Sequence, residues 1–336
     1  HIEEIVTVLI PNTGTLEANL RSGSIDMVST LGMSFDQALA FDRRVEGSDL
    51  PFDVNFRAGF VYEHIDLDLD EPVLQDPRVR RALVYAIDRE RLTEALFEGR
   101  QPPALHFEAP ASPWYTDDPE KIVVYEHSRR TAAELLDEAG WTLGEDGLRY
   151  DQQGNPLRLT LSTTAGNKMR EIVQVYLQDQ WRAIGVDTRI QNGPARIFFG
   201  QTIRRRLFDG AAMYAWIQSP ELSPRPTVHS TQIPSEANGW SGQNNPGWAS
   251  PRVDWLVEAL EAEFDAGKRL DLIHEILWHY TSEVPVIPLY YRSENSVTPA
   301  NLTGYRVTAH QVYATNHVER WNLEQVPAER VGKTGP

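Results

Sequence analysis

The stretch KMREIVQVYLQDQWRAIGVDTRIQ, residues 168–191, decides the fold class because it joins an amphipathic helix directly to a strand. Its first part predicts a long helix over 168–185 that ends at a glycine, and VDTRIQ predicts a strand. The chain opens in the same manner, with an expected strand over 3–11, a short helix that stops at Gly23, and a new strand from Ile25. Helices that alternate with strands are typical of an α/β layer, which is the fold class expected here.

The remaining segments continue this alternation. The clearest helix is expected over 76–100, where Asp76 is the N-cap, Pro77 is the first residue and Gly99 ends the helix. HIDLDLDEP (64–72) alternates apolar and acidic residues with period two, which predicts a half-buried strand. The other expected elements are a helix over 128–139, a hairpin over 146–162, helices over 251–263 and 268–282, and a strand over 285–292.

The composition excludes several classes of protein. The net charge is −16, from 48 acidic residues against 32 lysines and arginines, and this charge opposes contact with a nucleic-acid backbone. No apolar run approaches the ~18 residues of a membrane span. The absence of cysteine removes disulfides, thiolate zinc sites and thiol nucleophiles. The opening HIEEIVTVLIP contains no visible targeting signal.

Three short motifs imitate functional sites and fail on detail. DLDLDE (66–71) resembles a calcium loop but has Glu71 where glycine is required. HEILWH (274–279) resembles a zinc-protease motif, but its histidines are five residues apart rather than four. GWSGQ (239–243) ends one residue short of a nucleophile elbow. Asp and Glu are numerous enough that some pair must lie at the distance of glycosidase carboxylates, but no feature of the sequence supports such a pair. No catalytic or metal-binding residue is therefore expected.

A strand that carries a tryptophan near its end leads into an unusually long polar loop. Residues 211–217 predict a buried strand with Trp216 close to its end, and the region 218–251 beyond it is rich in Pro, Gly, Asn and Ser. A connection of this length is either functional or poorly ordered. Trp216, Trp240 and Trp248 lie in or beside the loop, and for each of them contact with a ligand and packing under the loop have equal weight.

Several segments occur in an order that is specific as a set. They are DPRVRRALVYAIDRERL (76–92), AELLDEAGW (133–141), GNPLRLTL (154–161), FDGAAMYAW (208–216) and EVPVIPLYYR (283–292). This order resembles the family 5 extracellular solute-binding proteins of ABC transporters, the oligopeptide, dipeptide and nickel group. The resemblance implies a type II fold like that of periplasmic binding proteins, with two α/β lobes hinged around a ligand.

The resemblance also implies a division of the chain. Members of the family are longer at the N-terminus, so the sequence is expected to be a C-terminal portion of such a protein. Residues 1–66 are then part of the first lobe, 67–285 the second lobe, and 286–336 the C-terminal return to the first lobe. A cleft with one incomplete wall is expected to bind its ligand weakly.

The ligand site implied by the resemblance lies where the strand 208–217 ends, in agreement with ligand binding beyond the carboxyl ends of strands in α/β sheets. Oligopeptide binders of the family have an aspartate soon after the tryptophan, in a pattern like W-x-x-D-Y, which pairs with the amino terminus of the peptide. This sequence lacks that aspartate, and Glu221 is the only carboxylate in the stretch 213–226. The expected ligand-binding residues are Tyr214, Trp216, Gln218, Ser219, Glu221, Trp240, Asn244 and Arg204.

The expected function is that of the substrate-binding component of an ABC importer, which binds a peptide and delivers it to the membrane permease. No covalent chemistry, cofactor or metal is expected. The protein is expected to be a monomer that is periplasmic or lipid-anchored at the outer face of the cytoplasmic membrane. An oligosaccharide stacked on the tryptophans, or a metal chelate, is the alternative ligand, and glycoside hydrolysis is the less favoured alternative activity.

Overall fold

A computed structural model describes residues 2–309 and 314–324 of the chain. Its contacts divide the chain into two units, one of residues 60–291 and one that combines 1–59 with 292–336. Both divisions fall inside long strands, β1 (Phe52–Leu67) and β7 (Val286–Pro299). The chain therefore passes between the units twice within regular structure.

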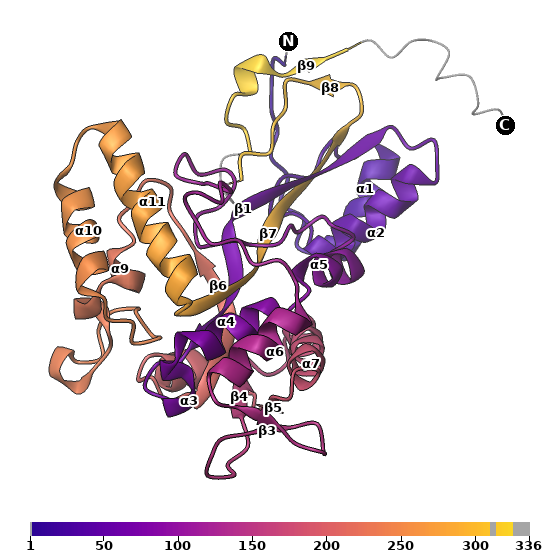
Figure 1. Cartoon of the computed structure of the whole chain (residues 1–336). Helices are drawn as coiled ribbons and strands as arrows, with labels where there is room; N and C mark the ends of the chain where they lie inside the picture. Colours follow the sequence, from indigo (N-terminus) through magenta and orange to yellow (C-terminus); the bar gives the residue numbers. More distant parts are fainter. Residues whose placement is uncertain (1, 310–313, 325–336) are drawn as a thin grey trace. The chain divides into compact units, whose positions relative to one another are not determined.

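The unit of residues 60–291 contains most of the helices (Figure 1). Its longer helices are α4 (Pro77–Tyr85), α5 (Arg89–Phe97), α6 (Arg129–Glu138), α7 (Lys168–Arg182), α10 (Pro251–Ala262) and α11 (Ala266–Glu283). Its short helical segments are α3 (Pro72–Gln75), α8 (Ala195–Ile197), the π-helical turn η2 (Phe198–Ile203), α9 (Arg225–Val228), η3 (Ser230–Gln232) and η4 (Glu236–Asn238). Its strands besides β1 and β7 are β2 (Thr142–Leu143), β3 (Arg149–Tyr150), β4 (Arg158–Ser162), β5 (Asp187–Ile190) and β6 (Gly210–Ile217).

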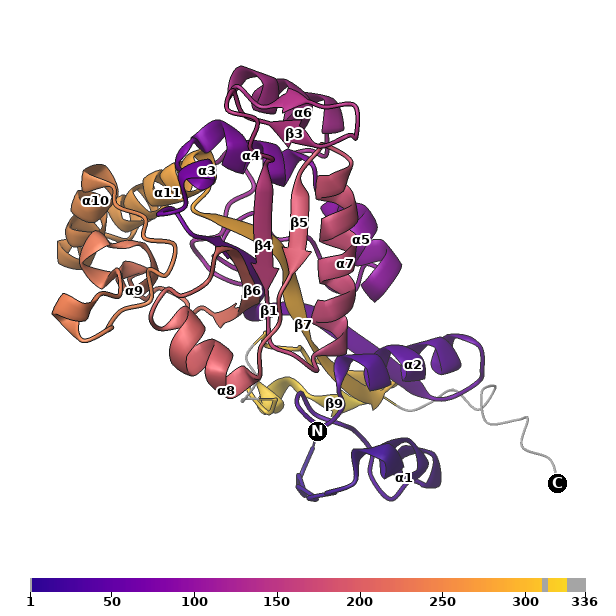
Figure 2. The same cartoon turned by 90° about the horizontal axis from the view of Figure 1, so that it is seen from below.

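Five strands form the main sheet in the order β5-β4-β6-β1-β7. Strand β4 runs parallel to both β5 and β6, whereas β1 runs antiparallel to β6. Figure 2 shows β4 and β5 side by side with α7 next to β5. A mixed sheet with helices packed against it confirms the α/β class predicted from the alternation of helices and strands.

Helix α7 confirms the helix predicted for 168–185. Val173, Leu177 and Trp181 are fully buried, and their spacing of four places them along one face of the helix. The indole Nε1 of Trp181 donates a hydrogen bond of 3.0 Å to the carbonyl oxygen of Leu83 in α4. The only polar group of the Trp181 side chain thus has a hydrogen-bond partner inside the core.

One face of β1 carries a buried ion pair. The carboxylate of Glu63 accepts hydrogen bonds of 3.1 Å from Nε and 3.2 Å from Nη2 of Arg170, at the start of α7. Nη1 of Arg170 donates to the hydroxyl of Thr164 at 3.1 Å. Both charged side chains are buried, so the bidentate geometry compensates a carboxylate that water does not reach.

Two strand predictions near the N-terminus were wrong. Residues 2–10 form no regular structure, because a β-branched sequence becomes a strand only when another strand supplies hydrogen-bond partners, and no described residue does so here. The exposed aliphatic side chains of this segment are Ile5, Val6, Val8 and Leu9. The strand expected from Ile25 is reduced to one bridge between Val28 and Val297.

The helix predicted over 76–100 is two helices. Helix α4 ends at Tyr85, and α5 begins after Asp88, whose carboxylate accepts a hydrogen bond of 2.9 Å from the backbone N–H of Arg91. A side chain that caps a new helix competes with continuation of the preceding one. The hairpin predicted over 146–162 is present only at its turn, where Tyr150 and Pro156 form an antiparallel bridge. Beyond the turn, β3 pairs with β2 while β4 joins the main sheet.

Strand β1 is longer and more deeply buried than predicted. The alternation in 64–72 predicted a half-buried strand, but the strand begins at Phe52, ends at Leu67, and buries Asp66 together with Ile65. Both faces of the strand are covered near its end, so Asp66 does not face solvent.

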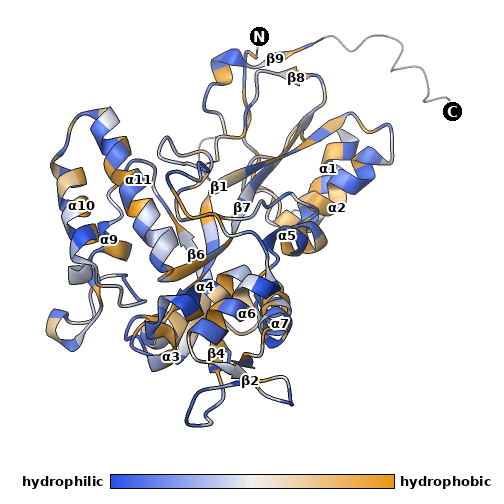
Figure 3. Ribbon diagram, in the orientation of Figure 1, coloured by the Kyte–Doolittle hydropathy of each residue, from blue (hydrophilic) through white to orange (hydrophobic). Residues whose placement is uncertain are grey.

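Helices α10 and α11 form an antiparallel pair and confirm the helices predicted near 251–263 and 268–282 (Figure 1). Each carries both hydrophobic and hydrophilic residues along its length (Figure 3). No helix in the described part of the chain has the length and apolar character needed to cross a membrane.

The other unit has a small core of its own. Its elements besides β1 and β7 are η1 (Thr13–Thr15), α1 (Leu16–Ser22), α2 (Phe35–Glu46), β8 (Leu302–Thr303), η5 (Val318–Arg320) and β9 (Asn322–Leu323). Leu16 and Leu20 of α1 pack with Phe41 of α2 and with Val297 of β7. The core thus joins the two ends of the chain.

Candidate functional site

The antiparallel pairing of β1 and β6 places aromatic side chains side by side. Tyr62 lies opposite Trp216, and His64 lies opposite Tyr214. Because alternate residues of a strand share a face, all four side chains and Asp66 are on one side of the sheet. The rings of Tyr62 and His64 stack at 4.7 Å, His64 meets Tyr214 edge-on at 4.5 Å, and Tyr214 meets Trp216 edge-on at 6.5 Å.

A pocket opens over this face of the sheet. The pocket contains about 330 Å³ of space free of atoms, part of which is open to solvent. Its lining residues are Tyr62, His64, Asp66, Phe107, Tyr214, Trp216, Thr227, Gln243, Pro246, Tyr280 and Val286. All of them belong to the unit of residues 60–291.

The polar centre of the pocket is formed by Asp66 and Tyr214. The phenol of Tyr214 donates to Oδ2 of Asp66 and accepts a hydrogen bond of 2.8 Å from the side-chain amide of Asn245. Burial, together with the charge of Asp66, raises the pKa of Tyr214 well above its ordinary value. Tyr214 therefore stays neutral and orients the carboxylate.

Two further phenols and one imidazole complete the polar lining. Burial raises the pKa of Tyr62 and of Tyr280, so both hydroxyl groups stay neutral. Nε2 of His64 lies 3.3 Å from Oδ1 of Asp66. Nδ1 of His64 is buried and has no hydrogen-bond partner among the residues that the structure describes. The pocket thus combines aromatic walls with a small number of polar atoms, as binding sites for small ligands do.

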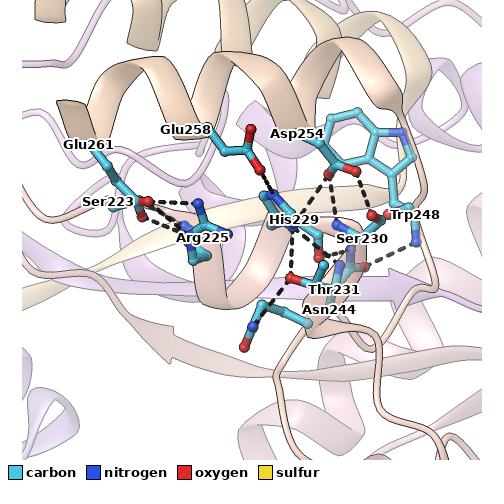
Figure 4. A network of polar contacts seen from close by, with 11 residues as sticks. Ser223, Arg225, His229, Ser230, Thr231, Asn244, Trp248, Asp254, Glu258 and Glu261 are labelled. Carbon is cyan, nitrogen blue, oxygen red and sulfur yellow. Dashed lines mark hydrogen bonds and ion pairs between the residues drawn. The ribbon is translucent and has the colours of Figure 1, made fainter. Parts of the chain in front are cut away.

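One wall of the pocket comes from the long loop 218–251, which supplies Thr227, Gln243 and Pro246. A polar network attaches this loop to α10 (Figure 4). Oδ1 of Asp254 accepts a hydrogen bond of 2.8 Å from the backbone N–H of Ser230, and Oδ2 accepts one from its hydroxyl. These side-chain contacts hold the loop together with backbone hydrogen bonds, such as that from Leu69 N–H to the carbonyl oxygen of Pro246 at 3.0 Å.

Further contacts extend this network in both directions (Figure 4). Arg225 forms a bidentate pair with Glu261, with a shortest distance of 2.7 Å. The buried ring of His229 lies between two acids, with Nδ1 3.6 Å from Asp254 and Nε2 3.5 Å from Glu258. Several charged contacts thus connect one side of α10 to the loop.

The structure brings together two of the side chains predicted to bind a ligand, Tyr214 and Trp216, which both line the pocket. The other six predicted residues are not among those that line the pocket. The backbone N–H of Gln218 bonds to Phe60, and Trp240 lies under the guanidinium of Arg205 at 5.8 Å. The exposed members of the predicted set are Arg204, Ser219 and Glu221.

Asn244, the remaining predicted residue, is fully buried. Its amide donates to the carbonyl oxygens of His229 and Trp248, and its side-chain oxygen accepts from the N–H of Trp248. The hydrogen-bonding groups of Asn244 therefore serve the loop itself.

Sequence reasoning missed the residues that β1 contributes to the pocket, Tyr62, His64 and Asp66. A signal was available, since these residues recur at every second position and therefore share a face. His274 and His279 both lie on α11, and no group of metal-ligating side chains occurs among the described residues.

Comparison with known proteins identifies the family of the chain. The model of a family described as bacterial extracellular solute-binding proteins, family 5 middle, matches residues 1–234. The oligopeptide-binding protein AppA of Bacillus subtilis (strain 168) is 25% identical over 324 residues, which are 96% of this chain and 56% of AppA. The nickel-binding periplasmic protein of Escherichia coli (strain K12) is 27% identical over 225 residues, 67% of this chain and 41% of that protein. The chain spans about half the length of the curated relatives it matches.

Solved structures show the same similarity. The oligopeptide-binding protein of Thermus thermophilus, complexed with a pentapeptide, is 29% identical with a TM-score of 0.71, over 88% of this chain and 52% of that one. AppA of Bacillus subtilis, in complex with a nonapeptide, is 25% identical with a TM-score of 0.70, over 94% of this chain and 60% of that one. The family resemblance and the type II fold predicted from the sequence are thus confirmed. The residues that match the family model make up more than half of the chain. The chain therefore belongs to the bacterial extracellular solute-binding proteins of family 5.

Proposed function

We propose that this protein binds a peptide and delivers it to the permease of an ABC importer. The observation that carries the proposal is the pocket in which Trp216, Tyr214 and Tyr62 surround a buried polar centre. Aromatic faces hold side chains of varied chemistry, while a few fixed polar atoms orient the ligand. The relatives from Bacillus subtilis and Thermus thermophilus are named as oligopeptide-binding proteins, which supports a peptide as the ligand.

The proposed role in transport has consequences for enzymatic activity, for the location of the protein and for the assignment of residues to its lobes. Binding requires no covalent change of the ligand, so we infer no enzymatic activity. The proposal also includes a monomeric state and a location in the periplasm or, by a lipid anchor, at the outer face of the cytoplasmic membrane, and the description of the family as extracellular supports a location outside the cytoplasm. Residues 67–285 then correspond to the second lobe of such a protein, and 1–66 with 286–336 to parts of the first lobe.

The test is direct identification of a ligand. The purified protein is incubated with an equimolar library of random pentapeptides, separated from unbound peptide by gel filtration, and denatured for mass spectrometry. We expect peptides to co-elute and selected sequences to give saturable heat in calorimetry. A control library of oligosaccharides is treated in the same way. Retention of the oligosaccharides together with loss of all peptides contradicts the proposal.

A further inference from the structure

The pocket contains a buried carboxylate that has no lysine or arginine partner in the lining. Asp66 is 3% exposed, and no lysine or arginine is among the residues that line the pocket. Its contacts within the described chain are the phenol of Tyr214 and the ring of His64. A buried carboxylate without a cationic partner carries a large desolvation cost.

A second buried acid on the same strand provides a comparison, because its charge is paired within the fold. Glu63, on the opposite face of β1, is 1% exposed and is paired with Arg170 through two hydrogen bonds. Asp66 is buried to a similar degree three residues later but has only neutral or imidazole partners. The difference singles out Asp66 as a buried carboxylate that lines the pocket without a lysine or arginine partner.

His64 adds an unused hydrogen-bond acceptor to the same space. In the neutral tautomer whose Nε2–H is directed at Oδ1 of Asp66, 3.3 Å away, Nδ1 carries a lone pair. His64 is 3% exposed, lines the pocket, and has no partner at Nδ1 within the described residues. A buried acceptor of this kind needs a donor from a ligand or from water.

The surrounding rings favour a cation in this position. Tyr62, Trp216 and Phe107 line the pocket around Asp66 and His64. Aromatic faces attract ammonium and guanidinium groups, and the attraction is stronger where water is excluded. The carboxylate, the free acceptor and the rings thus favour the same ligand chemistry.

We infer that this pocket binds a cationic nitrogen group of the ligand, an ammonium or a guanidinium, with Asp66 as its charge partner and His64 as a hydrogen-bond acceptor. The inference rests on the proposed function in that the cation belongs to a peptide, as its amino terminus or as a lysine or arginine side chain. Glu221, the carboxylate suggested by sequence, does not line the pocket. It is exposed, and its backbone carbonyl accepts from Arg269.

Four matched tripeptides distinguish the two sources of the cation. They are Ala-Lys-Ala and Ala-norleucine-Ala, each with a free and with an acetylated amino terminus, measured by calorimetry. We expect removal of the responsible cation to weaken binding about tenfold or more, and the Asp66→Asn variant to abolish that difference. Asp187→Asn is the control, because it makes the same change in charge at an exposed ion pair on the edge strand β5. Equal affinities for all four peptides, or equal effects of the two variants, overturn the inference and leave the peptide proposal standing.

A second measurement covers the case in which Asp66→Asn does not fold, and it also separates the two proposals. Binding of n-butylammonium and of n-butanol to the unchanged protein is followed by saturation-transfer NMR, with a free tripeptide as competitor. We expect signal from n-butylammonium alone and its displacement by the tripeptide. Binding of the ammonium without competition by any peptide supports the cation pocket and contradicts peptide binding. Equal signals from the ammonium and the alcohol, or none from either, overturn the inference.

Discussion

Trp216 lies near the end of a strand and has two roles, one in lining the pocket and one in packing against the core. A substitution can distinguish these roles. Its half-buried indole lines the pocket and packs at the edge of a cluster that includes Phe198 and Tyr214. We expect Trp216→Ala to weaken peptide binding by about 1–3 kcal/mol, because the ring supplies contact area to the ligand. Calorimetry with a selected peptide gives the affinity, and circular dichroism verifies the fold.

Trp255→Ala is the matched control for this substitution. Trp255 is 52% exposed on α10 and does not line the pocket. An unchanged affinity of Trp216→Ala, combined with a loss of folded protein, would show that the indole serves only the core.

Glu108 makes stability depend on pH. Burial raises the pKa of this carboxyl to about 7, while a hydrogen bond from Ser112 opposes the increase. The folded state therefore holds the proton more tightly than the unfolded state, and the free energy of unfolding falls as pH rises from about 4.5 to about 7. In Glu108→Gln, the decrease in the free energy of unfolding between pH 5 and pH 8 should be smaller by about 2–3 kcal/mol.

Urea unfolding at a series of pH values measures this difference. Glu90→Gln, at an exposed position in the first turn of α5, is the control and should retain the slope of the wild type. A Glu108→Gln variant whose stability varies with pH as the wild type does would contradict the prediction.

The residues of the pocket were only partly predictable. Tyr214 and Trp216 were identified because an apolar strand ended in a polar loop, which marks a strand end that reaches a site. Asp66 was missed because HIDLDLD alternates in the same way whether the polar face meets solvent or a second layer. Deciding between these cases requires knowledge of the helix and loop that cover the face, and they come from sequence more than 100 residues away.

At the scale of elements, the loop 218–251 depends on its polar network with α10. Asp254→Ala removes two hydrogen bonds to Ser230, one of them to the backbone. Since these bonds involve a charged acceptor, we expect the free energy of unfolding to fall by about 1.5–3 kcal/mol. We also expect affinity for the peptide to fall, because Thr227, Gln243 and Pro246 on the loop line the pocket.

Hydrogen exchange tests this local effect. The amide of Ser230 and those of residues 225–246 should exchange faster in Asp254→Ala, whereas the amides of α7 should not change. Asp271→Ala, at an exposed position on α11, is the control. Uniformly faster exchange throughout the protein would mean that the network supports the whole unit rather than the loop.

The helices and the strands β5, β6 and β7 were predicted from local signals, whereas the pairing of strands with distant partners was not. Helices α6, α7, α10 and α11 follow from their apolar spacing and their terminal residues. The segment 2–10 has strand-forming residues but no partner strand in the described chain, and β3 pairs with β2 rather than with β4. Sequence pattern specifies a face, whereas strand pairing is specified by the rest of the molecule.

At the scale of the whole molecule, the two units differ in how the chain builds them. The unit 60–291 is one continuous segment with its own buried core and most of the main sheet. We expect this segment, expressed alone, to unfold cooperatively in urea and to retain its helical circular dichroism. If the segment shows no cooperative unfolding transition, the unit needs the parts of β1 and β7 that lie outside 60–291 in order to fold.

The other unit is assembled from both ends of the sequence, and this has a consequence for synthesis. Leu16 and Phe41 pack against Val297, so the core of this unit cannot close until β7 has been translated. At bacterial rates of roughly 5–20 residues per second, the ribosome needs on the order of 10–50 s to make the intervening segment 60–291. The nascent helices α1 and α2 spend this interval without the part of their core that β7 supplies. A pause in translation of 60–291 lengthens the time during which chaperones compete with aggregation for them.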